Sequence, residues 1–373
     1  PSREPKVANE PDPEYKLENN YLKVTVNPAT GDLSSIYDKQ NQRELLTGAG
    51  NKLQAFEDQG QYWDAWNIAP DYEQKQLPDT ELTSINWIDS GLGKVIRVVK
   101  QLNQSQFTQD YILELDSPLL KITNHVNWQE TQVMVKVSFP LNLSSDRLTH
   151  DIPCGTIDRS TKPQTAAEQA KWEVPALNWA DLTDPEQNYG VSLLNDCKHG
   201  YDAKPDELRL TLLRSPLWPD PQSDRGEHHF TYAIYPHQGN WQTANTVRRG
   251  YELTTPLTVV LVDYLSGTLC DRQQQQTNLN SLSPVKELLN LSAQNLVLMA
   301  LKLSAEHEIV LRCYESQGKP ASLEIKSDLN LELDAQLDCL ERPLNYYQQA
   351  IGDIQPYKIK TYSLKAAREK NNA

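Results

Sequence analysis

The stretch that decides the fold is LLKITNHVNWQETQVMVKVSF, residues 119–139. In its first part, residues 119–128, apolar and polar side chains alternate, and its second part, residues 133–139, is rich in valine. Alternation with a period of two is typical of a strand in an antiparallel sheet that buries one face. We therefore expect both parts to be strands of this kind.

Other segments repeat this pattern along the chain, separated by turns that contain Gly, Pro, Asn or Asp. The expected strands include residues 21–26, 95–100, 111–115, 207–213 and 230–235. Strands do not alternate regularly with long helices, so a doubly wound or TIM-barrel fold is not expected. Helical signals are few: they fall on residues 165–172, 240–252 and 283–291, with Asn240 as a candidate cap.

Length and composition exclude several classes of protein. A chain of 373 residues exceeds one typical domain, so two domains are expected. The net charge is −14 and no basic stripe is present, which argues against nucleic acid and against an anionic membrane surface as partners. The longest apolar run, residues 257–262, is far shorter than the roughly 20 residues of a membrane span.

Cysteine usage and the chain start indicate a cytoplasmic protein. The five cysteines are scattered and form no CxxC pair, so we expect reduced, buried thiols and no zinc ribbon. No signal peptide is recognisable, and the polar start without methionine predicts a segment of something longer. The five cysteines are Cys154, Cys197, Cys270, Cys313 and Cys339.

Composition along the chain predicts the domain boundaries. Residues 271–292 begin with the polar, low-complexity DRQQQQ and are interpreted as a linker. The expected order is a polar tail (1–19), a large β-domain (20–270), the linker (271–292), a small antiparallel sandwich (293–366) and a tail (367–373).

The stretch QYWDAWNIAPDYEQ, residues 61–74, is dense in aromatic rings and carboxylates. Sugars bind through stacking on aromatic rings and hydrogen bonds to carboxylates, so this composition fits a sugar site. The competing interpretation is the edge of a core strand with buried aromatics and turn-capping aspartates. The groups concerned are Tyr62, Trp63, Asp64, Trp66, Asp71 and Tyr72.

Two further stretches place polar groups where strands end. In residues 190–202 an apolar strand runs into Asp196 and Lys198, which suits a ligand site or an ordinary hairpin turn. In residues 212–237 Arg214 ends a strand and a proline-rich loop with Asp220 and Asp224 follows. No H-E-x-x-H, G-x-S-x-G or phosphate-loop motif occurs, so no metal site is predicted within this chain.

Three long motifs carry a resemblance to a known family. NKLQAFEDQGQYWDAWNI (51–68), WADLTDPEQNYGVSLLNDCKHGYD (179–202) and LTLLRSPLWPDPQSDRGEHHFTYAIYPHQGNW (210–241) resemble the C-terminal β-region of family 38 glycoside hydrolases, the class II α-mannosidases of the bacterial and cytosolic-type branch. The resemblance implies an all-β fold: a galactose-mutarotase-like β-supersandwich followed by a small β-sandwich. It also implies a parent enzyme that hydrolyses α-mannosides with retention, through an aspartate nucleophile and a zinc ion.

One departure from the family limits what carries over. The nucleophile and zinc ligands of the family lie in an N-terminal barrel and the helical segment after it, which this sequence lacks. No catalytic residue, metal ligand or cofactor is therefore assigned to this chain. The implied partners are that barrel and mannosides, and an exposed face would favour a homo-oligomer. The residues expected at the edge of the sugar site or at the interface are Asp64, Trp66 and Arg214, then Asp196, Lys198 and Asp224.

Two alternatives stay open. A mutarotase-like epimerase would use its own acid and base, for which His125, His228 and Glu227 are available. A stand-alone carbohydrate-binding module would use the aromatic stretch as a stacking platform. If the chain turned over a mannoside by itself, the nucleophile would be sought among Asp64, Asp196, Asp220 and Asp224.

Overall fold

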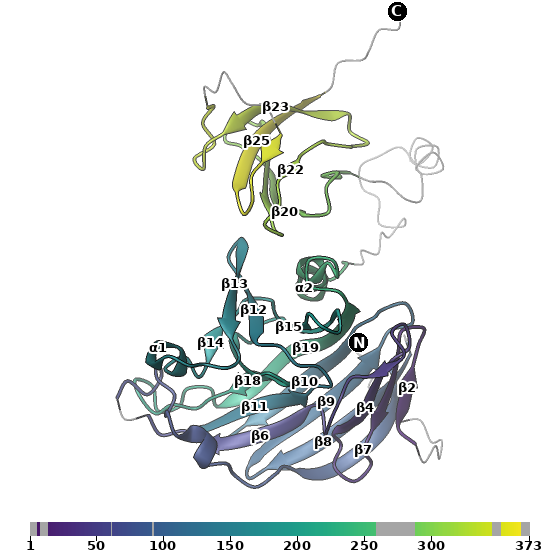
Figure 1. The fold of residues 1–373 in the computed structure, drawn as a ribbon, viewed down its shortest axis with the longest axis vertical. Coiled ribbons are helices and arrows are strands. Elements are labelled where there is room, and N and C mark those ends of the chain that lie inside the picture. Colours follow the sequence, from purple (N-terminus) through teal and green to yellow (C-terminus); the bar gives the residue numbers. More distant parts are fainter. Residues whose placement is uncertain are drawn as a thin grey trace, which may run out of the picture. The chain divides into compact units, whose positions relative to one another are not determined.

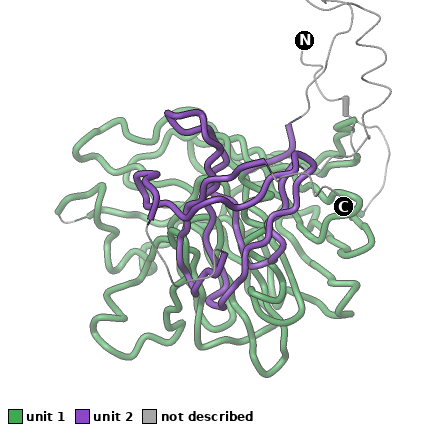
Figure 2. Tube along the Cα trace, turned by 90° about the horizontal axis from the view of Figure 1, so that it is seen from above, with its two compact units in different colours: residues 1–254 green, residues 255–373 purple. Residues whose placement is uncertain are grey.

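The computed structural model describes residues 6–7, 14–60, 62–91, 93–258, 288–344 and 352–366. The chain divides into two compact units, residues 1–254 and 255–373 (Figure 2). Strands make up most of the described elements, and their pairings are antiparallel. The expected all-β fold class, a large supersandwich followed by a small antiparallel sandwich, is therefore confirmed.

The largest sheet of the first unit is centred on the first half of the deciding stretch (Figure 1). β10 pairs with β9 on one side and with β19 on the other, so that His125 lies opposite Thr108 and His229. In spatial order the sheet contains β1 (Lys6–Val7), β7 (Glu81–Asp89), β8 (Lys94–Leu102), β9 (Ser105–Leu113), β10 (Leu120–Trp128), β19 (Gly226–Gln238), β16 (Tyr189–Asn195), β15 (Trp179–Asp184), β12 (Arg147–Ile152) and β13 (Gly155–Ser160).

The second half of the stretch, β11, belongs to a different sheet. Ile122 and Val126 of β10 join Val135 and Val137 of β11 in one buried cluster, so the apolar faces of the two strands build the same core. Burying each such side chain contributes about 1.5–3 kcal/mol. In spatial order this sheet contains β14 (Val174–Pro175), β17 (Gly200–Lys204), β18 (Glu207–Leu213), β11 (Val133–Pro140) and β6 (Lys52–Glu57), and a further sheet contains β2 (Lys16–Glu18), β3 (Leu22–Val26), β4 (Leu33–Asp38) and β5 (Arg43–Glu44).

β11 differs from the expectation because it is buried on both faces rather than one. Its second face carries Met134, which packs with Phe56, Ala69 and Tyr72. These partners show that the segment between β6 and the short 3₁₀ helix η1 (Tyr72–Gln74) lies over this face. The same segment holds Asp64 and Trp66, two of the six residues predicted at the edge of the sugar site, so the core of the unit supports it directly.

The helical expectations are met in part. A short helix, α1 (Ala166–Gln169), begins as predicted, and Thr165 and Glu168 form a capping box at its start. The helix predicted over 240–252 begins later, as α2 (Thr246–Thr254). The cause is local: the Asn240 side chain accepts a hydrogen bond from the Thr243 N–H at 3.0 Å and so caps a turn instead.

Some predicted segments lie partly or wholly outside the described residues. Of the helix predicted over 283–291, residues 283–287 lie outside the described residues. In the described remainder, Asn290 forms a β-bridge with Lys326. Residues 271–287 of the predicted linker (271–292) and the whole predicted tail 367–373 also lie outside the described residues. Within the predicted tail 1–19, β1 and β2 pair with β7 and β3.

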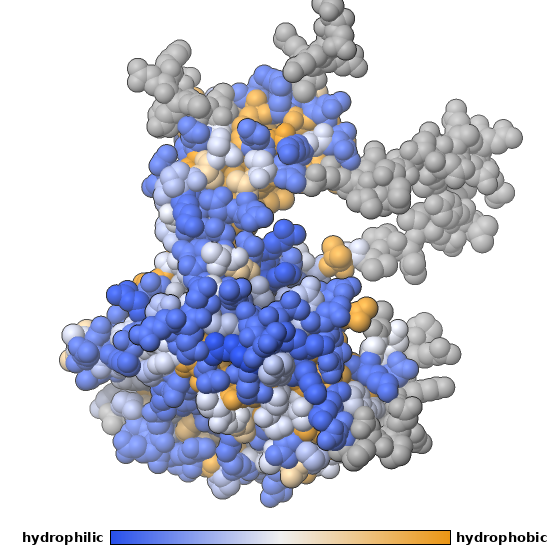
Figure 3. Space-filling model, turned by 45° about the vertical axis from the view of Figure 1, so that its right-hand side comes forward, coloured by the Kyte–Doolittle hydropathy of each residue, from blue (hydrophilic) through white to orange (hydrophobic). Residues whose placement is uncertain are grey.

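The second unit is a small antiparallel sandwich. One sheet contains β20 (Leu296–Leu303), β21 (Ile309–Glu315), β25 (Ile359–Ala366) and β23 (Leu331–Leu337), and the other contains β22 (Ala321–Ser322) and β24 (Asp353–Ile354). Its core is formed by Leu311, Cys313, Ile354 and Tyr362, among others. Apolar side chains gather on the visible face of this unit (Figure 3).

The remaining sequence expectations concern cysteines and membranes. The four cysteines in the described part of the chain, Cys154, Cys197, Cys313 and Cys339, form no disulfide, while Cys270 lies outside that part. The expectation that the thiols are buried is wrong for Cys197 and Cys339, which are exposed, and for Cys154, which is partly buried; Cys313 is buried. Among the described helices, none is long and apolar enough to cross a membrane.

Candidate functional site

Three tryptophan side chains are exposed together on two neighbouring loops of the first unit. Trp63 and Trp66 belong to the loop after β6, and Trp218 belongs to the loop after β18. Their exposed fractions are 62, 67 and 48%, and their ring centroids lie 5.0–6.5 Å apart. Exposed clusters of large apolar rings mark binding surfaces. We call these three residues the tryptophan wall.

Arg214, at the end of β18, holds the first of these loops in place. Its guanidinium group forms an ion pair with the buried carboxylate of Asp58 at 2.5 Å. It also donates hydrogen bonds to the main-chain carbonyl oxygens of Asp64 and Asn67 at 3.0 and 2.9 Å. Asp58 in turn accepts a hydrogen bond from the N–H of Ala69 at 2.9 Å. Arg214 therefore acts on the loop through its backbone.

Asp64 joins the two loops of the tryptophan wall to each other. Its side chain is buried, and one oxygen accepts a hydrogen bond from the Leu217 N–H at 2.6 Å. The other oxygen accepts from the Gly60 N–H at 3.3 Å. The carboxylate is thus directed at backbone donors, whereas the neighbouring indole of Trp66 is open to solvent. A contact of Trp66 with sugar stays a prediction.

The other three predicted residues, Asp196, Lys198 and Asp224, form a second group beside the loops of the tryptophan wall. The Lys198 ammonium lies 4.4 Å from the centre of the Phe230 ring, and one Asp196 oxygen accepts a hydrogen bond from the Thr231 N–H at 2.9 Å. Burial lowers the pKa of Lys198, and nearby Asp224 and Asp196 oppose this effect.

Asp224 connects this group electrostatically to Arg214. Asp224 is exposed as a residue, but the protein around its carboxyl group raises its pKa, and its neighbours His228, Lys198 and Arg214 oppose that rise. The structure thus brings Arg214, Asp224 and Lys198 into one electrostatic neighbourhood, on segments far apart in sequence. The six predicted residues therefore occupy adjoining loops.

The three groups considered for an epimerase do not converge. His125 contacts the Glu227 carboxylate and stacks on His229, with ring centroids 4.3 Å apart. His228 lies one residue out of phase in β19, opposite Val126, so it belongs to the other face of the sheet. Its Nε2 contacts the carbonyl oxygen of Asp224 at 2.6 Å. This geometry provides no joint acid and base from His125, Glu227 and His228.

Sequence reasoning missed two members of the site. Asp58 precedes the aromatic stretch, and the signal available for it is a carboxylate six residues before Asp64 that could pair with Arg214. Trp218 lies in the proline-rich loop, outside the aromatic stretch. The available signal was a large apolar ring within PLWPDP, where no strand can bury it.

The described residues offer no group of three or more His, Cys, Asp or Glu side chains placed to hold a metal ion. Zinc, which the family resemblance implies, therefore finds no matching set of ligands within this described part. No chemical step through zinc is assigned to these residues.

Comparisons with known proteins place the chain in a class and then in a family. Both units match models of glycoside hydrolase C-terminal regions: residues 17–222 match the glycosyl hydrolases family 38 C-terminal domain, and residues 295–362 match the family 38 C-terminal beta sandwich domain. The chain belongs to glycosyl hydrolase family 38, as its C-terminal β-region. The resemblance inferred from the sequence is thereby confirmed.

Relatives and solved structures agree with this assignment. The chain is 30% identical over 347 residues to alpha-mannosidase 2C1 of Homo sapiens and 30% identical over 370 residues to an alpha-mannosidase of Saccharomyces cerevisiae. These matches cover 90 and 94% of the chain but only 32 and 33% of the relatives, so the chain spans about a third of their length.

A solved alpha-mannosidase from Enterococcus faecalis shares the fold. The TM-score is 0.76 at 16% sequence identity, and the match covers 93% of this chain and 42% of that chain. At this identity the likeness shows the fold alone.

Proposed function

We propose that this chain is the non-catalytic part of an α-mannosidase and completes a sugar site on an N-terminal catalytic barrel of the same polypeptide. The observation that carries the proposal is the tryptophan wall, held against the sheet by Arg214 and Asp58. Family membership and the names of the relatives support mannosides as the substrate. The parent protein hydrolyses terminal α-mannosides with retention of configuration in the cytoplasm.

The chemistry of the wall suits sugar binding rather than bond cleavage. Indole rings present flat apolar faces to the C–H groups of a pyranose, and their N–H groups can donate to its hydroxyls. Two carboxylates of the loop that carries Trp63 and Trp66, Asp58 and Asp64, are occupied by Arg214 and by backbone N–H groups. In this proposal the aspartate nucleophile and the zinc ion belong to the N-terminal barrel, and the wall positions the sugar for them.

Hydrolysis of an aryl α-mannoside tests this division of labour. The purified chain is expected to show no turnover above buffer with added zinc, while the full-length protein hydrolyses the substrate under the same conditions. Turnover by the chain alone would contradict the proposal and place a nucleophile among its own carboxylates.

Arg214→Ala in the full-length protein is expected to lower kcat/KM by roughly 10- to 150-fold. The loss corresponds to about 1.5–3 kcal/mol for breaking charged hydrogen bonds, since about 1.4 kcal/mol is a factor of ten. Arg214 acts through the loop and is a positioning residue, so tryptophan fluorescence should also change in the isolated chain. Arg248→Ala, which removes an exposed arginine paired with Glu252, is the matched control and should leave both readouts unchanged. Unaltered kinetics in a folded Arg214→Ala protein would remove this role.

A second candidate function is a stand-alone carbohydrate-binding module. The three exposed indoles favour it, because they form a stacking surface without any other domain. Calorimetry of the isolated chain with mannose and mannobiose distinguishes the two functions. Heat of binding that disappears in Trp66→Ala would support the module, whereas binding seen only in the full-length protein would support the composite site.

A further inference from the structure

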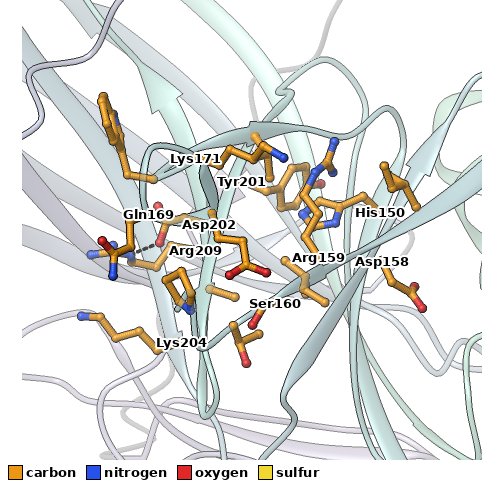
Figure 4. A pocket seen from close by; sticks show the side chains of 18 of the residues that line it. His150, Asp158, Arg159, Ser160, Gln169, Lys171, Tyr201, Asp202, Lys204 and Arg209 are labelled. Atoms are coloured by element: carbon orange, nitrogen blue, oxygen red, sulfur yellow. Dashed lines mark hydrogen bonds and ion pairs between the residues drawn. The ribbon is translucent and has the colours of Figure 1, made fainter. Parts of the chain in front are cut away.

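A pocket of about 400 Å³ opens in the first unit, and it contains none of the residues of the tryptophan wall (Figure 4). Its walls come from β12 and β13, from the segment of α1 and β14, and from β17 and β18. Figure 4 shows Arg159 beside His150 on one wall and Arg209 near Gln169 on the other. The volume lies within the range of small-molecule sites, which is about 300–1,000 Å³.

His150 is the feature that points to a ligand. Its side chain is only 1% exposed, yet neither ring nitrogen has a hydrogen-bond partner among the described residues. Buried polar groups of proteins are nearly always paired, so an unpaired imidazole that lines a pocket needs a partner from outside the chain. The carbonyl groups of Leu148 and Ile157 lie near the ring but do not satisfy it.

The protonation state of His150 defines what that partner offers. Burial, and then the positive charge of Arg159, lower the pKa of His150 to about 4. The imidazole is therefore neutral near neutral pH, with one nitrogen as donor and the other as acceptor. A hydroxyl group, which both donates and accepts, is the simplest complement to such a ring.

The charges that line the pocket balance one another. The lining contains equal numbers of basic and acidic residues. Arg209 is paired with Asp202 and Glu73, both at 2.5 Å, and Glu168 caps α1 through Thr165. The balanced charges favour an uncharged ligand over an anion or a cation.

An aromatic ring completes the set of groups that a sugar uses. Trp172 lines the pocket and is 37% exposed, and Ile157 adds apolar surface. An exposed indole beside hydrogen-bonding groups is suited to one face of a pyranose. Hydroxyl recognition, neutral charge and an aromatic surface thus occur in the same cavity.

We propose that this pocket binds a neutral hexose unit, with Trp172 stacked on the ring and His150 hydrogen-bonded to a hydroxyl. The inference does not rest on the proposed function, because it concerns residues of this chain alone and needs no second domain. It adds a sugar site apart from the tryptophan wall, so a branched or extended glycan has a second place to be held.

NMR titration of the full chain with methyl α-D-mannopyranoside tests the proposal. The imidazole signals of His150, assigned by their absence in His150→Phe, are expected to shift with a dissociation constant on the order of 1 mM. Trp172→Ala should weaken this binding by at least about tenfold. Trp66→Ala, which alters only the tryptophan wall, is the matched control and should leave the His150 titration unchanged.

Inorganic phosphate serves as the charged comparison. A shift of the His150 signals by phosphate and not by the mannoside would overturn the assignment to a neutral sugar. Unmoved signals at saturating mannoside, or an identical titration in Trp172→Ala, would equally overturn it. The Trp172 side chain is partly exposed, so that variant should keep its fold, and an unchanged Tm verifies this.

Discussion

A Lys136→Met variant is expected to lose about 3–5 kcal/mol of unfolding free energy. Lys136 is fully buried and contacts Glu173, Asp202 at 2.8 Å and the Thr211 hydroxyl at 2.7 Å. Burial alone would lower the pKa of Lys136, but Asp202 and Glu173 outweigh burial and raise it, so the ammonium stays charged. Removing it leaves two carboxylates with too little positive charge, since Arg209 compensates only Asp202 directly.

Chemical unfolding of two further variants gives this prediction its controls. Lys162→Met breaks an ion pair with Asp146 that is exposed on both sides and should cost no more than about 1 kcal/mol. Lys136→Met combined with Glu173→Gln should recover part of the loss, because one uncompensated charge disappears with its partner. Equal losses of unfolding free energy in Lys136→Met and Lys162→Met would contradict the prediction, because the buried ion pair would then stabilise the fold no more than the exposed one.

His150→Phe is expected to become progressively more stable than the parent chain as the pH falls from 6.5 to 4. The folded-state pKa of His150 is lowered to about 4 from an ordinary 6.5, by burial and then by Arg159. In this window the unfolded chain binds a proton at His150 that the folded chain resists. Between pH 6.5 and 4 the parent therefore loses roughly 3 kcal/mol of unfolding free energy through His150. The variant does not lose it, because phenylalanine binds no proton.

Urea unfolding across this pH range measures the difference between the two proteins. Asp151 and the other titrating groups contribute to both proteins alike, so the difference isolates His150. His125→Phe, which replaces a histidine exposed at the surface, is the control for losing an imidazole as such. A constant difference between parent and His150→Phe would contradict the prediction, because it would mean that His150 binds its proton equally well in the folded and the unfolded chain.

Much of the fold can be predicted from the period-two pattern, because a strand with one buried and one solvent-exposed face alternates apolar and polar residues. The strands expected near 21–26, 207–213 and 230–235 are present as β3, β18 and β19. Burial of both faces of β11 was not visible, since Lys136 and Ser138 look like solvent-facing positions. They become buried only because distant residues, Glu173 and Glu207, supply their partners.

The candidate site was predictable in composition but not in geometry. The motif resemblance groups Asp64 and Trp66 with Arg214, and Arg214 does donate a hydrogen bond to the main-chain carbonyl oxygen of Asp64. The direction of each side chain could not be predicted, because it depends on contacts between segments that are far apart in the sequence. Asp64 and Trp66 are two residues apart, yet one points at backbone donors and the other at solvent.

The way Arg214 holds its loop has a consequence for engineering. The groups it contacts on that loop beyond Asp58 are carbonyl oxygens, which every amino acid possesses. Exchanging Ala65 or Trp66 therefore leaves these bonds intact and keeps the backbone where it is. If the tryptophan wall contacts sugar as proposed, libraries at these two positions would vary that surface while its placement stays fixed, which makes this loop the starting point for redesigning glycan preference.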